Sequence, residues 1–157
     1  MAKPVEQIIS ELVDRDAIRE LPVKYCDCVW RNDVPGIVDL FAGDGAFITK
    51  GRKREHRAEG RDALLRLYGG LTGGDITPRP YIHNHVVELK GGGRATGRCY
   101  VEIRDAKKNF QWGGSGFYDD EYVKLGDRWK FKSRTFQAAH IEQMLNIVVF
   151  ILRHLFC

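Results

Sequence analysis

The sequence predicts an α+β domain in which helices pack on one face of a curved sheet. Through the first thirty residues, and again after Gly60, apolar side chains recur every three or four positions, a spacing typical of amphipathic helices. From Tyr81 onward the pattern changes to long β-prone segments separated by short turns rich in glycine and aspartate. Helices and strands are therefore segregated along the chain, which favours an antiparallel meander covered by helices.

The predicted helices each have a recognisable boundary or interruption. Pro22 should kink or restart the first helix, because proline lacks a backbone N–H. Asp33 is placed to cap the second helix, with Pro35 in its first turn. The helices are expected at residues 5–30, 34–41, 61–71 and 138–156.

The predicted strands follow from period-two patterns bounded by turns. Residues 51–60, between the first strand and the third helix, are expected to form a charged loop or hairpin tip. The basic run from Lys50 to Arg57 is interpreted as solvated, with phosphate or membrane-surface contact as the alternative. The strands are expected at residues 46–50, 81–90, 94–104, 110–125 and 128–137.

Composition limits the class of protein. The 157 residues are enough for one domain, residues 1–157, and the apolar and charged fractions of 43% and 29% are ordinary for a soluble globular protein. A formal charge of +4 and a pI near 8.9 do not indicate nucleic-acid binding. There is no GxGxxG after a strand, no P-loop and no HExxH, so neither a cofactor nor a metal is predicted.

Cellular location is predicted from termini and cysteines. The N-terminus lacks the apolar core of a signal peptide, and the run Ile147–Leu152 is too short to span a bilayer, so no membrane association is expected. The four cysteines match no disulfide or zinc framework, which favours reduced thiols in the cytoplasm. They are Cys26, Cys28, Cys99 and Cys157.

Four local motifs carry a resemblance to a known family. They are Asp16–Leu21 with the following Tyr25, Asn32-Asp33 and Leu40-Phe41; Gly60–Leu64; Ala95–Tyr100; and Tyr118–Tyr122 running to Gly126–Phe131. In their order and spacing the chain resembles the SnoaL-like branch of the nuclear-transport-factor-2-like (NTF2-like, cystatin-like) fold, over nearly its whole length. The resemblance implies a cone-shaped, curved antiparallel sheet on N-terminal helices, enclosing one pocket, with a C-terminal helix.

Within this fold the chain looks most like the dehydratase-type subgroup, which includes scytalone dehydratase and bile acid 7α-dehydratase. The resemblance implies a cofactor-free lyase, commonly trimeric, with a histidine base, a helix tyrosine and an aspartate that orients the histidine. A match to bile acid 7α-dehydratase without gaps from His83 to Tyr100 places His83 on the catalytic histidine and Tyr25 on the helix tyrosine. Trp30 stands where the aspartate is expected, which departs from the pattern.

Four candidate residues from the first helix and the strand at residues 81–90 each have a functional and a structural interpretation. His83 is either the general base or a hydrogen-bonded structural histidine. His85 shares a strand face with His83 if there is no bulge, and would be a second pocket imidazole, the base itself, or a structural histidine. Tyr25 would donate to a substrate oxygen or pack in the core. Trp30 would form a flat pocket wall or ordinary core.

Further substrate contacts are expected from the last two strands. Glycines at positions 113, 114 and 116 permit either a bend or close approach of a ligand. Arg134 would bind a carboxylate or phenolate at the pocket mouth, or form a surface salt bridge. The candidates are Trp112, Ser115, Phe117, Tyr118, Arg134 and Phe136, with His140 following them.

The leading functional hypothesis is a lyase, a dehydratase or eliminase, that acts on a small hydrophobic cyclic hydroxylated substrate. His83 would remove a proton beside a carbonyl while Tyr25 holds an oxygen. An isomerase or polyketide cyclase, a non-catalytic carrier favoured by Trp30, and a pure interaction module remain as alternatives. The apolar segment from Met144 to Phe156 favours a homo-oligomer, a trimer by resemblance with a dimer as the alternative.

Overall fold

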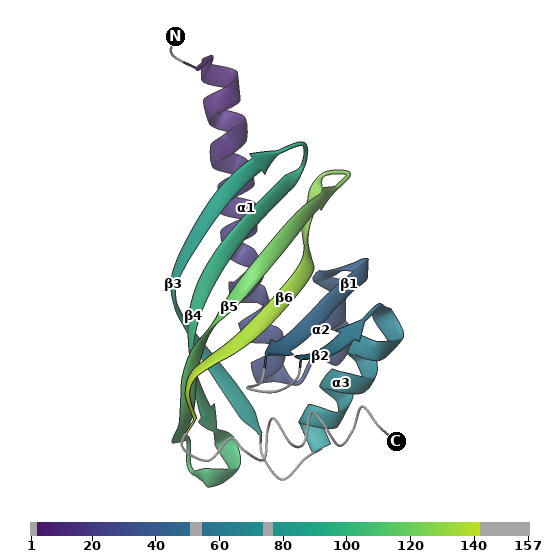
Figure 1. Cartoon of the computed structure of the whole chain (residues 1–157), viewed down its shortest axis with the longest axis vertical. Helices are drawn as coiled ribbons and strands as arrows, with labels where there is room; N and C mark the ends of the chain where they lie inside the picture. Colours follow the sequence, from purple (N-terminus) through teal and green to yellow (C-terminus); the bar gives the residue numbers. More distant parts are fainter. Residues whose placement is uncertain (1–2, 51–54, 74–76, 142–157) are drawn as a thin grey trace.

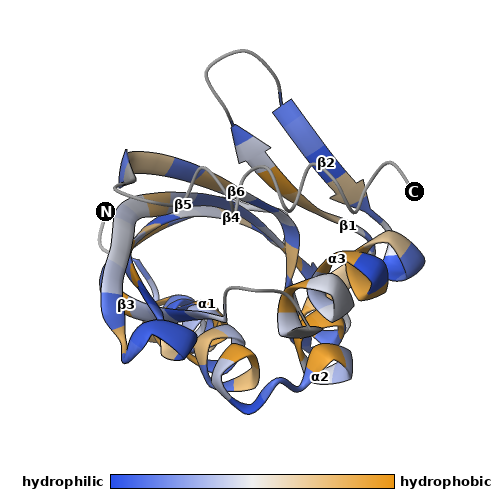
Figure 2. Ribbon diagram, turned by 90° about the horizontal axis from the view of Figure 1, so that it is seen from below, coloured by the Kyte–Doolittle hydropathy of each residue, from blue (hydrophilic) through white to orange (hydrophobic). Residues whose placement is uncertain are grey.

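The computed structural model describes residues 3–50, 55–73 and 77–141. Its strands form one curved sheet in the order β2-β1-β6-β5-β4-β3, and helices lie on the concave side of that sheet (Figures 1 and 2). This arrangement confirms the predicted α+β class and the curved sheet. The elements are α1 (Val5–Arg31), α2 (Val34–Asp39), β1 (Phe41–Lys50), β2 (Glu55–Glu59), α3 (Arg61–Gly73), β3 (Pro78–Gly91), β4 (Arg94–Asp105), a 3₁₀ turn (Ala106–Lys108), β5 (Gln111–Leu125) and β6 (Arg128–Ile141).

The N-terminal helices match the prediction except at Pro22 and at the end of the second helix, where Phe41 begins β1 five residues before the expected strand. Helix α1 continues through Pro22 instead of restarting there, and the buried proline ring packs in the core, which offsets the missing backbone hydrogen bond. The helix ends at Asn32, which adopts a left-handed conformation. Asp33 caps α2, since its carboxylate accepts a hydrogen bond of 2.9 Å from the Gly36 N–H.

The sheet is mixed, which corrects the expected all-antiparallel sheet. Strand β1 runs parallel to β6, and every other neighbouring pair is antiparallel. Residues 55–59, expected in a loop, form strand β2 and pair with β1, so the predicted hairpin tip is shorter than expected. Ala58 faces the interior from β2, and its apolar side chain helps to hold this charged segment on the sheet.

The last strand is longer than the sequence suggested. The prediction of a helix from Ala138 is wrong for residues 138–141, because β6 continues to pair with β5 as far as Gly114 and Ile141. The rest of that predicted helix, with the apolar segment and Cys157, lies outside the described residues. None of the helices in the described part of the chain has the length and apolar character needed to cross a membrane.

Candidate functional site

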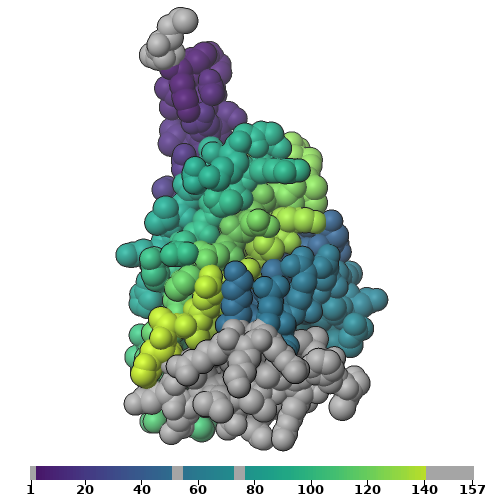
Figure 3. All heavy atoms as spheres, viewed as in Figure 1, coloured from purple at the N-terminus to yellow at the C-terminus, as the bar shows by residue number. Residues whose placement is uncertain are grey.

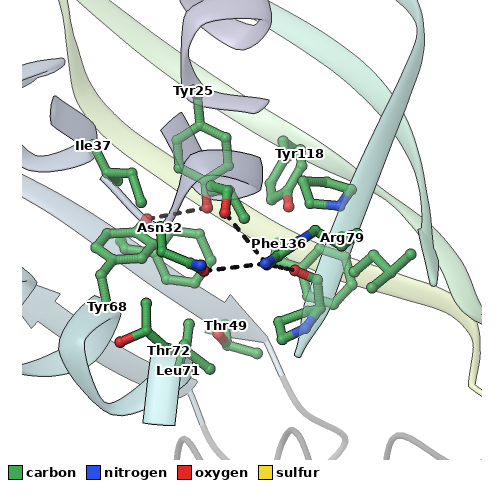
Figure 4. Close-up of a pocket in the computed structure, with 15 residues that line it drawn as sticks. Tyr25, Asn32, Ile37, Thr49, Tyr68, Leu71, Thr72, Arg79, Tyr118 and Phe136 are labelled. Carbon is green, nitrogen blue, oxygen red and sulfur yellow. Dashed lines mark hydrogen bonds between the residues drawn. The ribbon is translucent and has the colours of Figure 1, made fainter. Parts of the chain in front are cut away.

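A cavity lies between the helices and the concave face of the sheet (Figure 4). Its volume is about 80 Å³, which is room for a few water molecules. The described apolar lining comes from Val29, Ile37, Phe47, Leu71, Pro78, Pro80, Ile103 and Phe136. The polar lining comes from Tyr25, Asn32, Thr49, Tyr68, Thr72, Arg79 and Tyr118.

Three tyrosines from different elements meet at the inner wall of the cavity. Tyr68 of α3 donates a hydrogen bond of 3.2 Å to the Tyr25 hydroxyl of α1, and the Tyr118 ring of β5 packs edge-on against Tyr25. Burial raises the pKa of each of these three phenols above its usual value. All three therefore stay protonated at neutral pH, and they can donate hydrogen bonds without ionising.

Arg79 forms another part of the cavity wall, at the start of β3. It donates hydrogen bonds to the backbone carbonyl oxygens of Val29 and Pro78, both at 3.3 Å, and to Asn32 Oδ1 at 3.2 Å. Figure 4 shows these bonds converging on the guanidinium from α1 and β3. The contacts hold the cation beside the cavity while leaving other N–H groups of its fork free.

A buried ion pair lies behind the tyrosine rings. Arg134 of β6 is 0% exposed and lies over the faces of Tyr118 and Tyr25, at 3.8 and 4.3 Å from the ring centroids. Its Nε is 3.5 Å from Asp120 Oδ1. Burial opposes the charge of Arg134, but the Asp120 carboxylate and the surrounding phenols outweigh it and raise the guanidinium pKa. Arg134 is therefore a permanent buried cation.

The ion pair continues into a hydrogen-bonded chain with His85. Tyr122 donates its hydroxyl hydrogen to Asp120 Oδ2 at 2.9 Å, so His85 must donate from Nε2 to the Tyr122 oxygen at 3.0 Å. Burial, then the charges of Arg134 and Arg19, lower the pKa of His85 to about 4. Burial raises the pKa of Asp120 to about 6, although Arg134 and the Tyr122 hydroxyl lower it. His85 is thus neutral at pH 7, with a buried Nδ1 that has no partner among the described residues.

The structure does not place His83 in the cavity, contrary to the prediction. Its side chain is exposed, and it is absent from the described lining. The cause is an irregularity in the β3–β4 pairing between Ile82 and His85, which inserts one residue and exchanges the faces of the strand. Alternation back from His85 would put His83 and Tyr81 on the inner face, but the inserted residue puts Ile82 and Pro80 there instead.

Trp30 also lies outside the described lining. Its indole N–H donates to the Pro80 carbonyl oxygen at 2.8 Å, and its ring stacks on Phe110 and meets Tyr81 edge-on. The residue that replaces the expected aspartate therefore ties α1 to β3 instead of facing a ligand. Trp30 supports the cavity wall from behind.

The remaining predicted contacts divide into two groups. Tyr25, Tyr118 and Phe136 line the cavity, and their contact with a ligand stays a prediction. Arg134 is neither at the pocket mouth nor in a surface salt bridge, because Asp120 and aromatic faces enclose it. The other candidates outside the described lining are His85, Trp112, Ser115 and Phe117. Trp112 stacks on His140, and Phe117 packs under Arg98.

Four residues of the site were not singled out from the sequence. Tyr68 falls within the helix expected at residues 61–71, and Thr49 within the strand expected at residues 46–50. Arg79 lay in an expected loop, which hid its place on β3. Alternation along β5 puts Asp120 on the same face as Tyr118 and Tyr122, and that signal could have found it.

The described residues contain free thiols at Cys26, Cys28 and Cys99. Within the same ranges, no group of three or more histidine, cysteine, aspartate or glutamate side chains could hold a metal ion. The polar groups of the described lining are hydroxyl, guanidinium and amide groups.

Solved structures share this fold at low sequence identity. A Mycobacterium tuberculosis protein of unknown function superposes with a TM-score of 0.78 at 22% identity, covering 97% of this chain and 92% of that one. An NTF2-like protein with a cystatin-like fold from Novosphingobium aromaticivorans gives 0.76 at 18% identity, covering 95% and 99%. Hexachlorocyclohexane dehydrochlorinase LinA-type3 from Novosphingobium barchaimii gives 0.73 at 17% identity, covering 85% and 91%.

No curated protein matches the sequence. The model of the SnoaL-like domain matches residues 10–135, which include both helices and strands that build the cavity. With that match and a curved sheet closing over a tyrosine-lined cavity, the chain belongs to the SnoaL-like domain family.

Proposed function

We propose that the protein binds a small cyclic molecule, the size of a single ring, in the tyrosine-lined cavity. The main support is that Tyr25, Tyr68 and Tyr118 have protonated hydroxyls in a cavity whose other walls are largely apolar. Such a lining favours a ring with an oxygen acceptor, because apolar burial supplies affinity and a few donors set orientation. The small volume favours one ring over a polycyclic ligand.

Ligand binding without turnover fits the described lining best. None of the described lining residues is a histidine, an aspartate or a glutamate, and these are the usual general bases. His85 is neutral but hydrogen-bonded to Tyr122, outside the lining. This supports the non-catalytic alternative over a reaction with an internal base.

The binding proposal can be tested with two probes of similar shape. Acetophenone carries a carbonyl oxygen, and ethylbenzene lacks it. Because the Tyr68 hydroxyl already donates to Tyr25, the Tyr25 hydroxyl is the donor left for the ligand. We expect Tyr25→Phe to weaken acetophenone binding about three- to tenfold, the effect of one hydrogen bond, with ethylbenzene affinity unchanged. Calorimetric titration measures both dissociation constants.

Tyr100→Phe is the matched control, because Tyr100 is an exposed tyrosine on β4 outside the described lining. Equal effects of Tyr100→Phe and Tyr25→Phe would contradict the proposal. So would an absence of binding by both probes at millimolar concentration.

A lyase acting in the same cavity is the second candidate. Its support is the fold shared with hexachlorocyclohexane dehydrochlorinase LinA-type3 and the phenol donors, which suit an enolate-like or alkoxide-like charge. In the lyase hypothesis, His83 is the base and the substrate is a cyclic hydroxylated compound. An isomerase or a cyclase would use the same base and differ only in the product. Because His83 is exposed, we expect His83→Ala to leave both ligand affinity and any turnover unchanged. If His83→Ala instead lowers turnover a hundredfold or more, measured by NMR of the products, the result would support a lyase with His83 as base.

A further inference from the structure

We propose that the ligand carries a carboxylate and that Arg79 binds it, with the Thr49 hydroxyl as a second contact. This inference rests on the proposed binding function and narrows the ligand to a single-ring organic acid. It concerns two side chains that line one cavity from β3 and β1. Figure 4 shows both of them at this cavity.

The partners of Arg79 leave its charge uncompensated. Its hydrogen bonds, at 3.2 and 3.3 Å, go to two backbone carbonyls and one amide oxygen, all of them neutral. Six other arginines pair with a carboxylate within the described residues. They are Arg31, Arg57, Arg61, Arg98, Arg104 and Arg134. Arg79 is thus held in place by neutral groups, and its fork can still bind a planar anion.

Thr49 gives independent support. Its side chain is 3% exposed, and its hydroxyl has no hydrogen-bond partner among the described residues. A buried hydroxyl without a partner is unfavourable in the empty cavity, and a ligand oxygen would satisfy it. An unpartnered donor inside the cavity is therefore a sign that a polar group belongs there.

The charge of the cavity agrees with an anionic ligand. Arg79 is the charged side chain of the described lining, which includes no carboxylate, and the phenols remain neutral. The other nearby cation, Arg134, is already paired with Asp120. A ligand carboxylate would therefore meet a positive charge that no carboxylate of the described lining neutralises.

Benzoate and benzamide are the probes, since they share a shape and differ in charge. We expect the wild-type protein to bind benzoate at least about tenfold more tightly than benzamide, because hydrogen bonds to charged groups are the stronger ones. Arg79→Gln should abolish that preference and leave the benzamide affinity within about threefold. Arg79→Lys, which keeps the charge and loses the fork, should fall between them.

Thr49→Val separates a ligand contact from a structural one. It should weaken benzoate binding about three- to tenfold, whereas the unfolding midpoint should stay the same or rise because an unsatisfied hydroxyl is removed. Arg104→Gln is the matched control for Arg79, because Arg104 is the cross-strand partner of Arg79 on β4 but is paired with Glu102 and absent from the described lining.

The outcomes are distinct. If the wild type binds benzamide as tightly as benzoate, or if Arg104→Gln matches Arg79→Gln, the carboxylate inference is overturned and the binding proposal stands. If neither probe binds the wild-type protein, both are overturned. If Arg79→Gln fails to fold by circular dichroism, the Arg79→Lys and Thr49→Val titrations decide.

Discussion

At the scale of the residue, the most unusual group is the cation of Arg134, which is enclosed by rings. Tyr25, Tyr118 and Phe131 present their faces to it, and Asp120 supplies the counter-charge. Cation–π contact replaces part of the lost hydration, because the guanidinium nitrogens have no ordinary hydrogen bonds among the described residues. Removing one partner of such a buried ion pair costs several kcal/mol of stability, whereas replacing both partners together can cost little.

We therefore predict that Arg134→Met lowers the free energy of unfolding by about 3–5 kcal/mol, because it leaves the Asp120 carboxylate buried without a counter-ion. Adding Asp120→Asn should recover at least half of the loss. Urea unfolding of the double-mutant cycle measures both effects. Arg98→Met is the control, since Arg98 pairs with Asp119 at the surface and should cost under about 1 kcal/mol. A double variant as unstable as Arg134→Met alone would contradict the coupling.

At the scale of the element, strand irregularities decide which side chains face the cavity. The register between β5 and β6 shifts between Ser115 and Gly116. A Cβ at Gly116 would collide with the Gln137 carbonyl oxygen and lie 3.1 Å from Ala138 Cα, both in the backbone of β6. The glycine is therefore required for the close approach of two strands, which is the structural reading of the glycine-rich segment.

We predict that Gly116→Ala destabilises the protein by about 1–3 kcal/mol, because the β6 backbone has to move away. Gly43→Ala is the matched control, since a Cβ there meets nothing within 4 Å, and it should change stability by less than about 0.5 kcal/mol. Thermal unfolding followed by circular dichroism compares the two. Similar melting temperatures for both variants would contradict the prediction, because they would mean that the β6 backbone moves away from the added Cβ at little cost.

The first turns of α1 extend beyond the rest of the molecule (Figure 3). Their apolar side chains are largely exposed, as with Leu12 at 61% and Val13 at 62%. The periodic pattern therefore predicted the helix correctly, although the apolar side chains at this end have no core of described residues to face. A homo-oligomer remains a proposal, and this end of α1 offers a way to test it.

In the monomer, Leu12→Gln should change the free energy of unfolding by less than about 0.5 kcal/mol, because little apolar surface is lost from contact. Unfolding at micromolar and at hundredfold higher protein concentration checks this. A destabilisation that grows with protein concentration would support the proposed homo-oligomer and place this surface in its interface. A small effect at both concentrations would exclude this surface from the interface. Tyr100→Phe serves as an exposed control on β4.

At the scale of the whole molecule, the His85–Asp120 chain makes stability depend on pH in two opposite ways. The folded pKa of His85, about 4, is below its ordinary 6.5. In that window the unfolded chain binds the proton, so His85 makes stability rise with pH. The folded pKa of Asp120, about 6, is above its ordinary 3.8, so there the folded protein holds the proton and Asp120 makes stability fall as pH rises.

We predict that the two slopes largely cancel in the wild type between about pH 4 and 6.5. His85→Gln should expose the Asp120 effect, so that stability falls as pH rises relative to wild type. Asp120→Asn should expose the His85 effect and give a rise. Urea unfolding at several pH values measures the slopes, and parallel curves for all three proteins would contradict the assignment.

Local sequence patterns determined much of this molecule. The amphipathic spacing predicted α1 and α3, the Asp33 side chain predicted the cap of α2, and period-two alternation predicted the strands of the meander. These features follow from interactions within a few residues of the chain, so the sequence alone carries them.

Strand register was decided only by tertiary packing. The β5–β6 turn alone would set Asp119 opposite Arg134, but a shift between Glu121 and Tyr122 brings Asp120 there instead. A similar shift in β3 turns His85 inward and leaves His83 in solvent. One inserted residue exchanges the two faces of a strand, and whether it is inserted depends on how distant elements pack. The fold was therefore predictable from local patterns, whereas the identity of the inward-facing histidine was not.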